Sequence, residues 1–151
     1  WARAVWDAGI LPVALVPACG LLQVTDTDRF RREQQLSTFA LDRLLEVEQA
    51  YLGRRPRALE ELDLVDPLRV LERGEPPQRP LPPVFAGVGL GDPLYPDTRR
   101  LRAALDQLGV PCEDRYYPGE GHAFQALIFR SQARRYWEHC FAFLARHGLP
   151  G

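Results

Sequence analysis

Three short segments of the chain have the hydrophobic patterns of β-strands. Residues 11–16 and 84–90 are almost continuously apolar and too short for helices, a pattern typical of strands buried on both faces of a parallel sheet. Residues 112–117 alternate charged and apolar side chains instead. Alternation indicates one face in solvent, so we expect this third strand to lie near an edge of the sheet.

A long helix is predicted between the first and second strands. Ser37 and Thr38 can cap its start, and Gly53 ends it. Its apolar stripe would consist of Leu41, Leu44, Leu45, Tyr51 and Leu52. A shorter helix is predicted to end at Gly9, ahead of the first strand.

Two further helices are predicted, one after the second strand and one after the third. Asp97 or Thr98 would cap the first of them, and Gly109 would end it. The last helix is predicted over residues 131–146. Its buried stripe would comprise Trp137, Cys140, Phe141 and Leu144.

Residues 54–83 differ from the rest of the chain in composition. They are rich in charged residues and prolines, and they hold one short apolar helix at about 67–71, which Asp66 would cap. We interpret this stretch as an insertion rather than a part of the core.

The order of the predicted elements indicates an α/β layer structure, because strands alternate with helices. Three strands are few for such a sheet, and the first is as apolar as a central strand, so we expect further strands upstream of it. The chain also contains no methionine. We therefore expect residues 1–151 to be one partial domain, a piece of a longer protein.

Charge and cysteine content exclude several classes of partner. The 19 basic residues, all arginine, are balanced by 20 acidic ones, which argues against binding to nucleic acid or anionic lipid. The longest apolar run is interrupted by Pro12 and Pro17, so no membrane helix is expected. Three cysteines without metal-type spacing and no signal peptide favour a reduced, cytoplasmic setting.

Two residues with acid–base chemistry follow the carboxyl ends of the second and third strands. Asp92 comes directly after one strand, and His122 lies in the loop after the other. Because ligands of open parallel sheets bind at this edge, we expect the two side chains to meet there. An aspartate that orients a histidine is the acid–base pair of a nucleophilic triad. The plainer alternative is that Asp92 only forms the turn before Pro93.

The segments around these two residues resemble a known family. Asp92 begins a D-P-L motif after the strand, and His122 stands in a G-x-x-H-x-F motif. Both motifs, in this order, are similar to the C-terminal half of the hormone-sensitive-lipase-like esterases, which are α/β-hydrolases with the chain order Ser, Asp, His. The resemblance implies that Asp92 is the triad acid, that His122 is the base, and that residues 36–80 form a helical lid.

The nucleophile of that family is absent from this sequence. The family's serine stands in a G-x-S-x-G turn and its oxyanion hole in a His-Gly-Gly run, and the chain contains neither. Its only serines, Ser37 and Ser131, are both expected at helix starts. Cys19 follows a predicted strand, but Pro17 and Leu21 do not suit a nucleophile turn, so we interpret it as a packed, inert thiol.

The resemblance implies a carboxylic-ester hydrolase of the serine esterase and lipase type that needs no cofactor or metal. Phe39, Tyr51 and Phe124 would line a hydrophobic pocket for small uncharged esters. Two alternatives stay open: an amidase or lactonase on the same scaffold, and a non-catalytic fragment or association module. Without the nucleophile, the 151 residues alone are expected to be inactive. The third strand, near Cys112–Tyr117, is expected to pair with a second copy in a homodimer.

Overall fold

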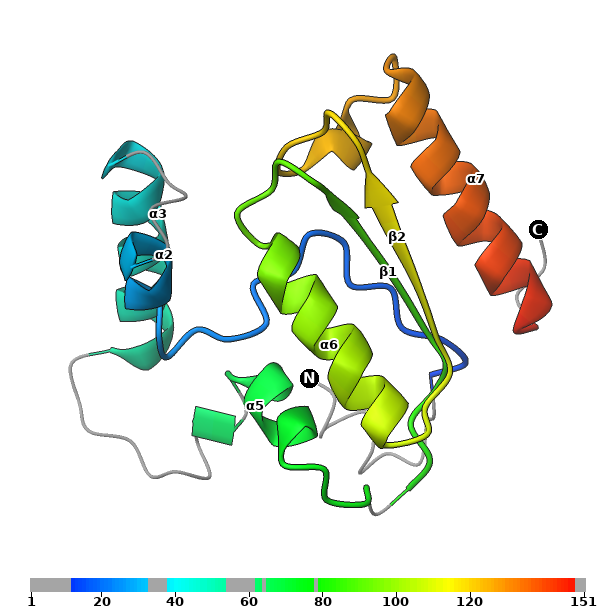
Figure 1. Ribbon diagram of the computed structural model, residues 1–151, viewed down its shortest axis with the longest axis horizontal. Helices are drawn as coiled ribbons and strands as arrows, with labels where there is room; N and C mark the ends of the chain where they lie inside the picture. Colours follow the sequence, from blue (N-terminus) through cyan, green and yellow to red (C-terminus); the bar gives the residue numbers. More distant parts are fainter. Residues whose placement is uncertain (1–11, 33–37, 54–61, 64, 78, 149–151) are drawn as a thin grey trace.

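The structure is a computed structural model that describes residues 12–148 apart from 33–37, 54–61, 64 and 78 (Figure 1). The helix predicted to end at Gly9 lies outside these residues. None of the described helices is long and apolar enough to cross a membrane. The described elements are, in chain order, α2 (Asp28–Arg32), α3 (Thr38–Leu52), α5 (Pro67–Glu72), β1 (Val84–Gly89), α6 (Tyr95–Gln107), β2 (Cys112–Tyr117), the 3-10 turn η1 (Phe124–Ala126) and α7 (Ser131–Arg146).

The centre of the fold is a parallel pair of strands. β1 pairs with β2 in a register that runs from Val84 opposite Cys112 to Gly89 opposite Tyr117. All six residues of β1 are buried, as predicted, whereas Arg115 of β2 is exposed. Since both strands end at the same level, the loops that follow them begin side by side (Figure 1). Pairing of β2 with a second copy stays a prediction.

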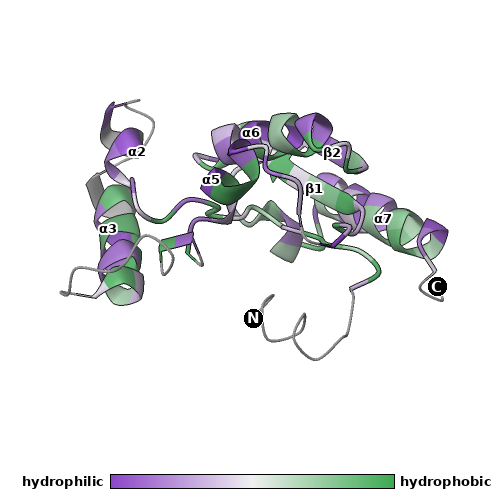
Figure 2. Ribbon diagram, turned by 90° about the horizontal axis from the view of Figure 1, so that it is seen from below, coloured by the Kyte–Doolittle hydropathy of each residue, from purple (hydrophilic) through white to green (hydrophobic). Residues whose placement is uncertain are grey.

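Different helices cover the two faces of β1. Phe85 packs against Tyr136 and Phe143 of α7, with ring centroids 5.7 and 5.6 Å apart. The neighbouring Val84 points to the other face, where it joins Leu101 of α6 in a second apolar cluster. Helices on both faces of a parallel sheet confirm the predicted α/β layer structure (Figures 1 and 2).

The buried stripe of α7 is rotated relative to the prediction. Tyr136, Cys140 and Phe143 are at most 2% exposed, whereas Phe141 is 60% exposed. Trp137 and Leu144, also predicted in the stripe, flank the core and are partly buried. Positions 136, 140 and 143 follow the i, i+4, i+7 spacing of one helix face, and this face turns toward β1. The prediction that Phe141 is buried is therefore wrong.

The first predicted strand is only partly formed. Leu15 and Ala18 make isolated parallel bridges to β1, and the Leu15 amide donates to the Pro83 carbonyl at 3.0 Å. Pro17 has no N–H to donate, so the pairing is interrupted between the two bridges. Val13 is 49% exposed and Leu15 38%. The expectation of a strand buried on both faces is thus wrong for these two side chains.

The predicted insertion contributes to the core through α5. Leu68 is fully buried and belongs to the same apolar cluster as Val84 and Leu101. A six-residue helix has one narrow apolar face, and α5 buries it against α6 and the sheet (Figure 1). The interpretation of residues 54–83 as lying outside the core is therefore wrong for α5.

Helix α3 lies with α2 to one side of the sheet (Figure 1). Leu41 of α3 forms an apolar cluster with Phe30 of α2 and with Leu94, which follows β1 closely in the chain. Ser37, one of the two predicted caps of this helix, lies outside the described residues. Through this cluster the predicted lid approaches the carboxyl end of β1.

The buried carboxylate of Asp66 fastens the segment before α2 to α5. It accepts hydrogen bonds from the amides of Val24 and Thr25 at 2.7 and 3.0 Å, and from the Thr25 hydroxyl. Asp66 stands at the start of α5, but its side chain makes no hydrogen bond to that helix. Asp66 thus occupies the predicted cap position, but its side chain does not cap the helix, because the adjacent chain offers it several donors.

Asp97 anchors the same segment to α6. It lies in the first turn of the helix, where its Oδ2 accepts the Leu22 amide at 3.1 Å and the Arg29 guanidinium at 2.8 Å. Leu94, not Asp97 or Thr98, occupies the position before the helix. Burial raises the pKa of the Asp97 carboxyl, and the adjacent Arg29 opposes that rise.

Candidate active site

Asp92 is positioned by the turn that follows β1. Its amide donates to the Gly89 carbonyl at 3.1 Å, which closes the turn, and its Oδ1 accepts the Leu94 amide at 2.8 Å. The residue is 3% exposed. Asp92 therefore does form the turn before Pro93, as the plainer alternative holds, and its second oxygen stays available for another partner.

His122 is positioned by the loop that follows β2. The Glu120 carbonyl of this loop accepts the Gly91 amide at 2.9 Å, so the loop is held against the end of β1. A side chain at Gly89 would overlap this same carbonyl, so only glycine lets the loop approach so closely. The two loops that begin side by side are in this way tied together, and His122 faces Asp92.

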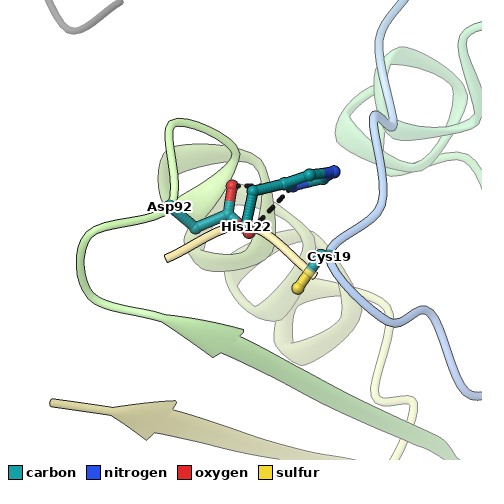
Figure 3. Close-up of side chains that lie close together, drawn as sticks. All are labelled: Cys19, Asp92 and His122. Carbon is teal, nitrogen blue, oxygen red and sulfur yellow. Dashed lines mark hydrogen bonds and ion pairs between the residues drawn. The ribbon is translucent and has the colours of Figure 1, made fainter. Parts of the chain in front are cut away.

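The two predicted residues meet in the structure. Nδ1 of His122 lies 3.2 and 3.1 Å from Oδ1 and Oδ2 of Asp92. The Asp92 side chain is fully buried, whereas that of His122 is 55% exposed. A buried carboxylate that accepts the Nδ1 proton leaves Nε2 as the free acceptor, and Figure 3 shows this end of the ring pointing away from Asp92. The pair can thus orient an imidazole and stabilise its protonated form; its catalytic role stays a prediction.

Cys19 lies beside the pair and is packed in the core, as the sequence predicts. It lies at the end of the segment beside β1, is 6% exposed, and has the rare left-handed φ of 47°. Figure 3 shows it next to Asp92 and His122. It reaches this place because it follows a strand-like segment that pairs in parallel with β1 and ends at the same edge of the sheet.

The Cys19 thiol is protonated at neutral pH. Its Sγ donates to Oε1 of Gln125 at 3.3 Å. Burial, together with the nearby Asp92 carboxylate, raises the pKa of this thiol to about 11. A protonated thiol beside the carboxylate end of the pair is a poor nucleophile, which agrees with the predicted inert character of Cys19 toward carbonyl groups.

Glu120 stabilises the loop that carries His122. The residue is 3% exposed, and its carboxylate lies 3.2 Å from the guanidinium of Arg130, the residue directly before α7. One of its oxygens, Oε2, has no hydrogen-bond partner within the described part of the chain. Glu120 could not be identified from the sequence, because an acidic residue in a glycine-rich loop gives no sign that it will be buried.

The three predicted pocket residues lie in different surroundings. Phe124 is 1% exposed and packs in the aromatic core, 4.9 Å from the ring of Tyr117, so its predicted place in a substrate pocket is wrong. Ala123, with φ of 57°, starts the 3-10 turn that directs this ring inward. Tyr51 is 59% exposed near the end of α3. Phe39 belongs to α3, but its side chain lies outside the described residues.

Solved esterase structures share this fold. A hormone-sensitive lipase from a metagenome library matches 97% of the chain with 22% identity and a TM-score of 0.74. An esterase of the bacterial hormone-sensitive lipase family matches 81% with 23% identity and a TM-score of 0.60. The esterase EstE5, soaked with p-nitrophenyl butyrate, matches 97% with 16% identity and a TM-score of 0.70. These identities establish the fold alone.

The chain spans less than half of each of these structures, covering 48%, 39% and 47% of them respectively. No curated protein matches it. A family model described as alpha/beta hydrolase fold matches residues 2–126, which is most of the sequence. The predicted family is confirmed by this match and by the parallel strands flanked by helices: the chain belongs to the alpha/beta hydrolase fold family.

Proposed function

We propose that this chain supplies the aspartate and the histidine of a Ser-Asp-His triad in a carboxylic-ester hydrolase. The observation that carries the proposal is the contact between His122 Nδ1 and the buried Asp92 carboxylate at the carboxyl edge of the sheet. In this role Nε2 of His122 takes the proton of the nucleophile and returns it to the leaving alcohol. Asp92 orients the ring and stabilises the imidazolium.

The nucleophile and the oxyanion hole would come from a segment that these 151 residues do not contain, because the sequence has no G-x-S-x-G motif. Cys19 does not replace it, since its thiol is protonated and hydrogen-bonded to Gln125. The substrate would be a small uncharged ester, as the esterase neighbours favour.

Hydrolysis of p-nitrophenyl butyrate by the longer protein that contains the G-x-S-x-G segment tests the proposal. Asp92→Asn should lower kcat about 10⁴-fold, because the imidazole loses its orienting partner, and His122→Ala should lower it about 10⁶-fold. The matched control is His147→Gln, at the far end of α7, which should keep full activity. Turnover that survives both substitutions would overturn the assignment.

The isolated 151-residue chain provides the second measurement. An aspartate and a histidine without a nucleophile give water little assistance, so p-nitrophenol release should match that of buffer. Clear turnover by this chain alone would mean that its own residues supply a nucleophile, which would contradict the proposed division of roles.

A further inference from the structure

Three side chains that bind metals in other proteins meet at one point of this fold. Cys19, Asp92 and His122 each offer a ligand atom, and these atoms all lie within 4.8 Å of one another (Figure 3). They come from three separate segments, namely the chain beside β1, the turn after β1 and the loop after β2. It is the one such cluster within the residues that the structure describes.

We propose that Cys19, Asp92 and His122 form a site for a soft divalent cation, Zn²⁺ or Cd²⁺. Thiolate, imidazole and carboxylate are the three ligand types that zinc prefers, and three protein ligands leave a fourth position for water. Ligand atoms around one tetrahedral zinc ion lie about 3.3–3.6 Å apart, so the cluster needs to contract by about 1 Å. In the proposed site, rotation of the Cys19 and His122 side chains would bring the ligand atoms this much closer.

The electrostatics of the cluster favour a doubly charged cation. On binding, the Cys19 S–H bond breaks, a sulfur–metal bond forms, and the proton goes to solvent. The thiolate and the Asp92 carboxylate then offset both charges of the ion in a site where the two residues are buried. The His122 side chain is 55% exposed, so an ion can enter from its side. When Nδ1 binds the metal, its proton moves to Nε2.

Cation binding would also inhibit hydrolysis, a consequence that rests on the proposed function. The metal occupies Nδ1 of His122 and the Asp92 carboxylate, and thereby replaces the contact that orients the imidazole. Nε2, now protonated, can no longer accept a proton from the nucleophile.

Cobalt spectroscopy on the whole 151-residue chain tests the site without any ester. Co²⁺ should bind with one equivalent, give the thiolate-to-cobalt band in the near ultraviolet, and be displaced by Zn²⁺. Cys19→Ser should abolish that band and weaken binding by at least about 100-fold, because loss of a group that only hydrogen-bonds to a metal ligand already weakens metal sites about 10–100-fold. The matched controls, Cys112→Ser and Cys140→Ser, should keep it.

Two outcomes would overturn the site: no thiolate band in the unsubstituted chain, or a band that survives Cys19→Ser. His122→Ala provides a second variant, since this exposed side chain is outside the core and its loss should weaken Co²⁺ binding while far-ultraviolet circular dichroism stays unchanged. Unchanged Co²⁺ affinity in a folded His122→Ala chain would also overturn it.

Inhibition is measured separately, on the longer hydrolase, as the ester turnover with and without Zn²⁺ and after addition of a chelator. Zn²⁺ should suppress turnover reversibly, and Cys19→Ser should raise the required concentration at least about 100-fold. A cobalt site without zinc inhibition would overturn the inhibitory role and leave the cation site. A longer protein with no ester turnover would overturn the proposed function alone.

Discussion

Two regions of the fold are stabilised in different ways. One is the proposed catalytic edge, where Asp92 meets His122, and the other is the segment of residues 22–30, called the hinge below. At the catalytic edge, His122 and Asp92 are held by backbone hydrogen bonds over an aromatic core that includes Tyr117, Phe124 and Tyr136. At the hinge, residues 22–30 are held by the buried carboxylates of Asp66 and Asp97. Apolar packing is insensitive to pH, whereas buried ion pairs respond to it, so the two regions should fail under different conditions.

The largest effect is expected in the aromatic core under the catalytic edge. Tyr136→Ala should lower the free energy of unfolding by about 3–5 kcal/mol, because the fully buried ring contacts Phe85, Tyr117 and Phe124 and its loss leaves a cavity. Urea denaturation followed by circular dichroism measures this.

The control for this substitution is Tyr136→Phe. The Tyr136 hydroxyl is buried without a hydrogen-bond partner among the described residues, so its removal should change the free energy of unfolding by less than about 1 kcal/mol. A large loss of stability in Tyr136→Phe would mean that the hydroxyl, and not the ring, stabilises this region.

The hinge should respond next most strongly. Arg29→Leu should lower the free energy of unfolding at pH 7 by about 3 kcal/mol, because it leaves the buried Asp97 carboxylate with only the more distant Arg100 guanidinium, 3.7 Å from Oδ1. Urea denaturation at several pH values should show this loss shrinking as the pH falls, since protonated Asp97 needs no cationic partner. A loss that is the same at every pH would contradict the ion-pair account.

The pH dependence of the unsubstituted chain follows from the same carboxyl group. The pKa of Asp97 is raised in the folded state, so the folded chain binds this proton more tightly than the unfolded chain does. The stability contributed by its protonated form is fully present below the ordinary aspartate pKa and is lost as the pH rises through the folded value. Denaturation of an Asp97→Asn chain across this range, compared with the unsubstituted chain, should lack this dependence.

A smaller effect is expected in the loop that carries His122. Arg130→Ala should lower the free energy of unfolding by about 1–3 kcal/mol, because Glu120 is left as a buried carboxylate without its partner. Arg135→Ala, an exposed position on α7, is the matched control and should stay within about 0.5 kcal/mol. Equal losses in both variants would show that the Glu120 pair is not the cause.

The smallest effect is expected at the surface of the hinge. Arg32 pairs with Asp26 at 2.8 Å, but both side chains are exposed, at 62% and 39%. Arg32→Ala should therefore change the free energy of unfolding by less than about 1 kcal/mol, in contrast to the buried Arg29 nearby. A thermal melt of the two variants side by side sharpens the distinction between buried and exposed pairs.

The sequence pattern predicted β1, β2 and their common edge well, because period and apolarity report burial directly. β1, β2 and the range of α7 follow from such patterns, and the meeting of Asp92 with His122 follows from parallel strands ending at one edge. The contacts that hold the hinge could not be predicted from such patterns. Asp66 and Asp97 look like helix caps in sequence, and only the tertiary fold brings residues 22–29 within reach of them.

The direction of individual side chains was the other feature that the sequence pattern did not predict. A helical stripe assigned from bulky residues gave Phe141 a buried place, whereas the sheet selects the face with Tyr136 and Phe143. Phe124, expected in a pocket, lies in the aromatic core for the same reason. The left-handed backbone at Cys19 and Ala123 decides where each side chain points, and no periodicity in the sequence reports it.

Alkylation of the buried thiols Cys19 and Cys140 measures local unfolding of this chain. Burial raises the pKa of Cys19 to about 11 and also raises that of Cys140, so neither thiol reacts readily with alkylating reagents in the folded chain. Their alkylation therefore requires local unfolding. For Cys19 the proposed catalytic edge must unfold, and for Cys140 the contact between α7 and the sheet must open. The ratio of the two labelling rates reports whether the edge opens by itself or only when α7 detaches.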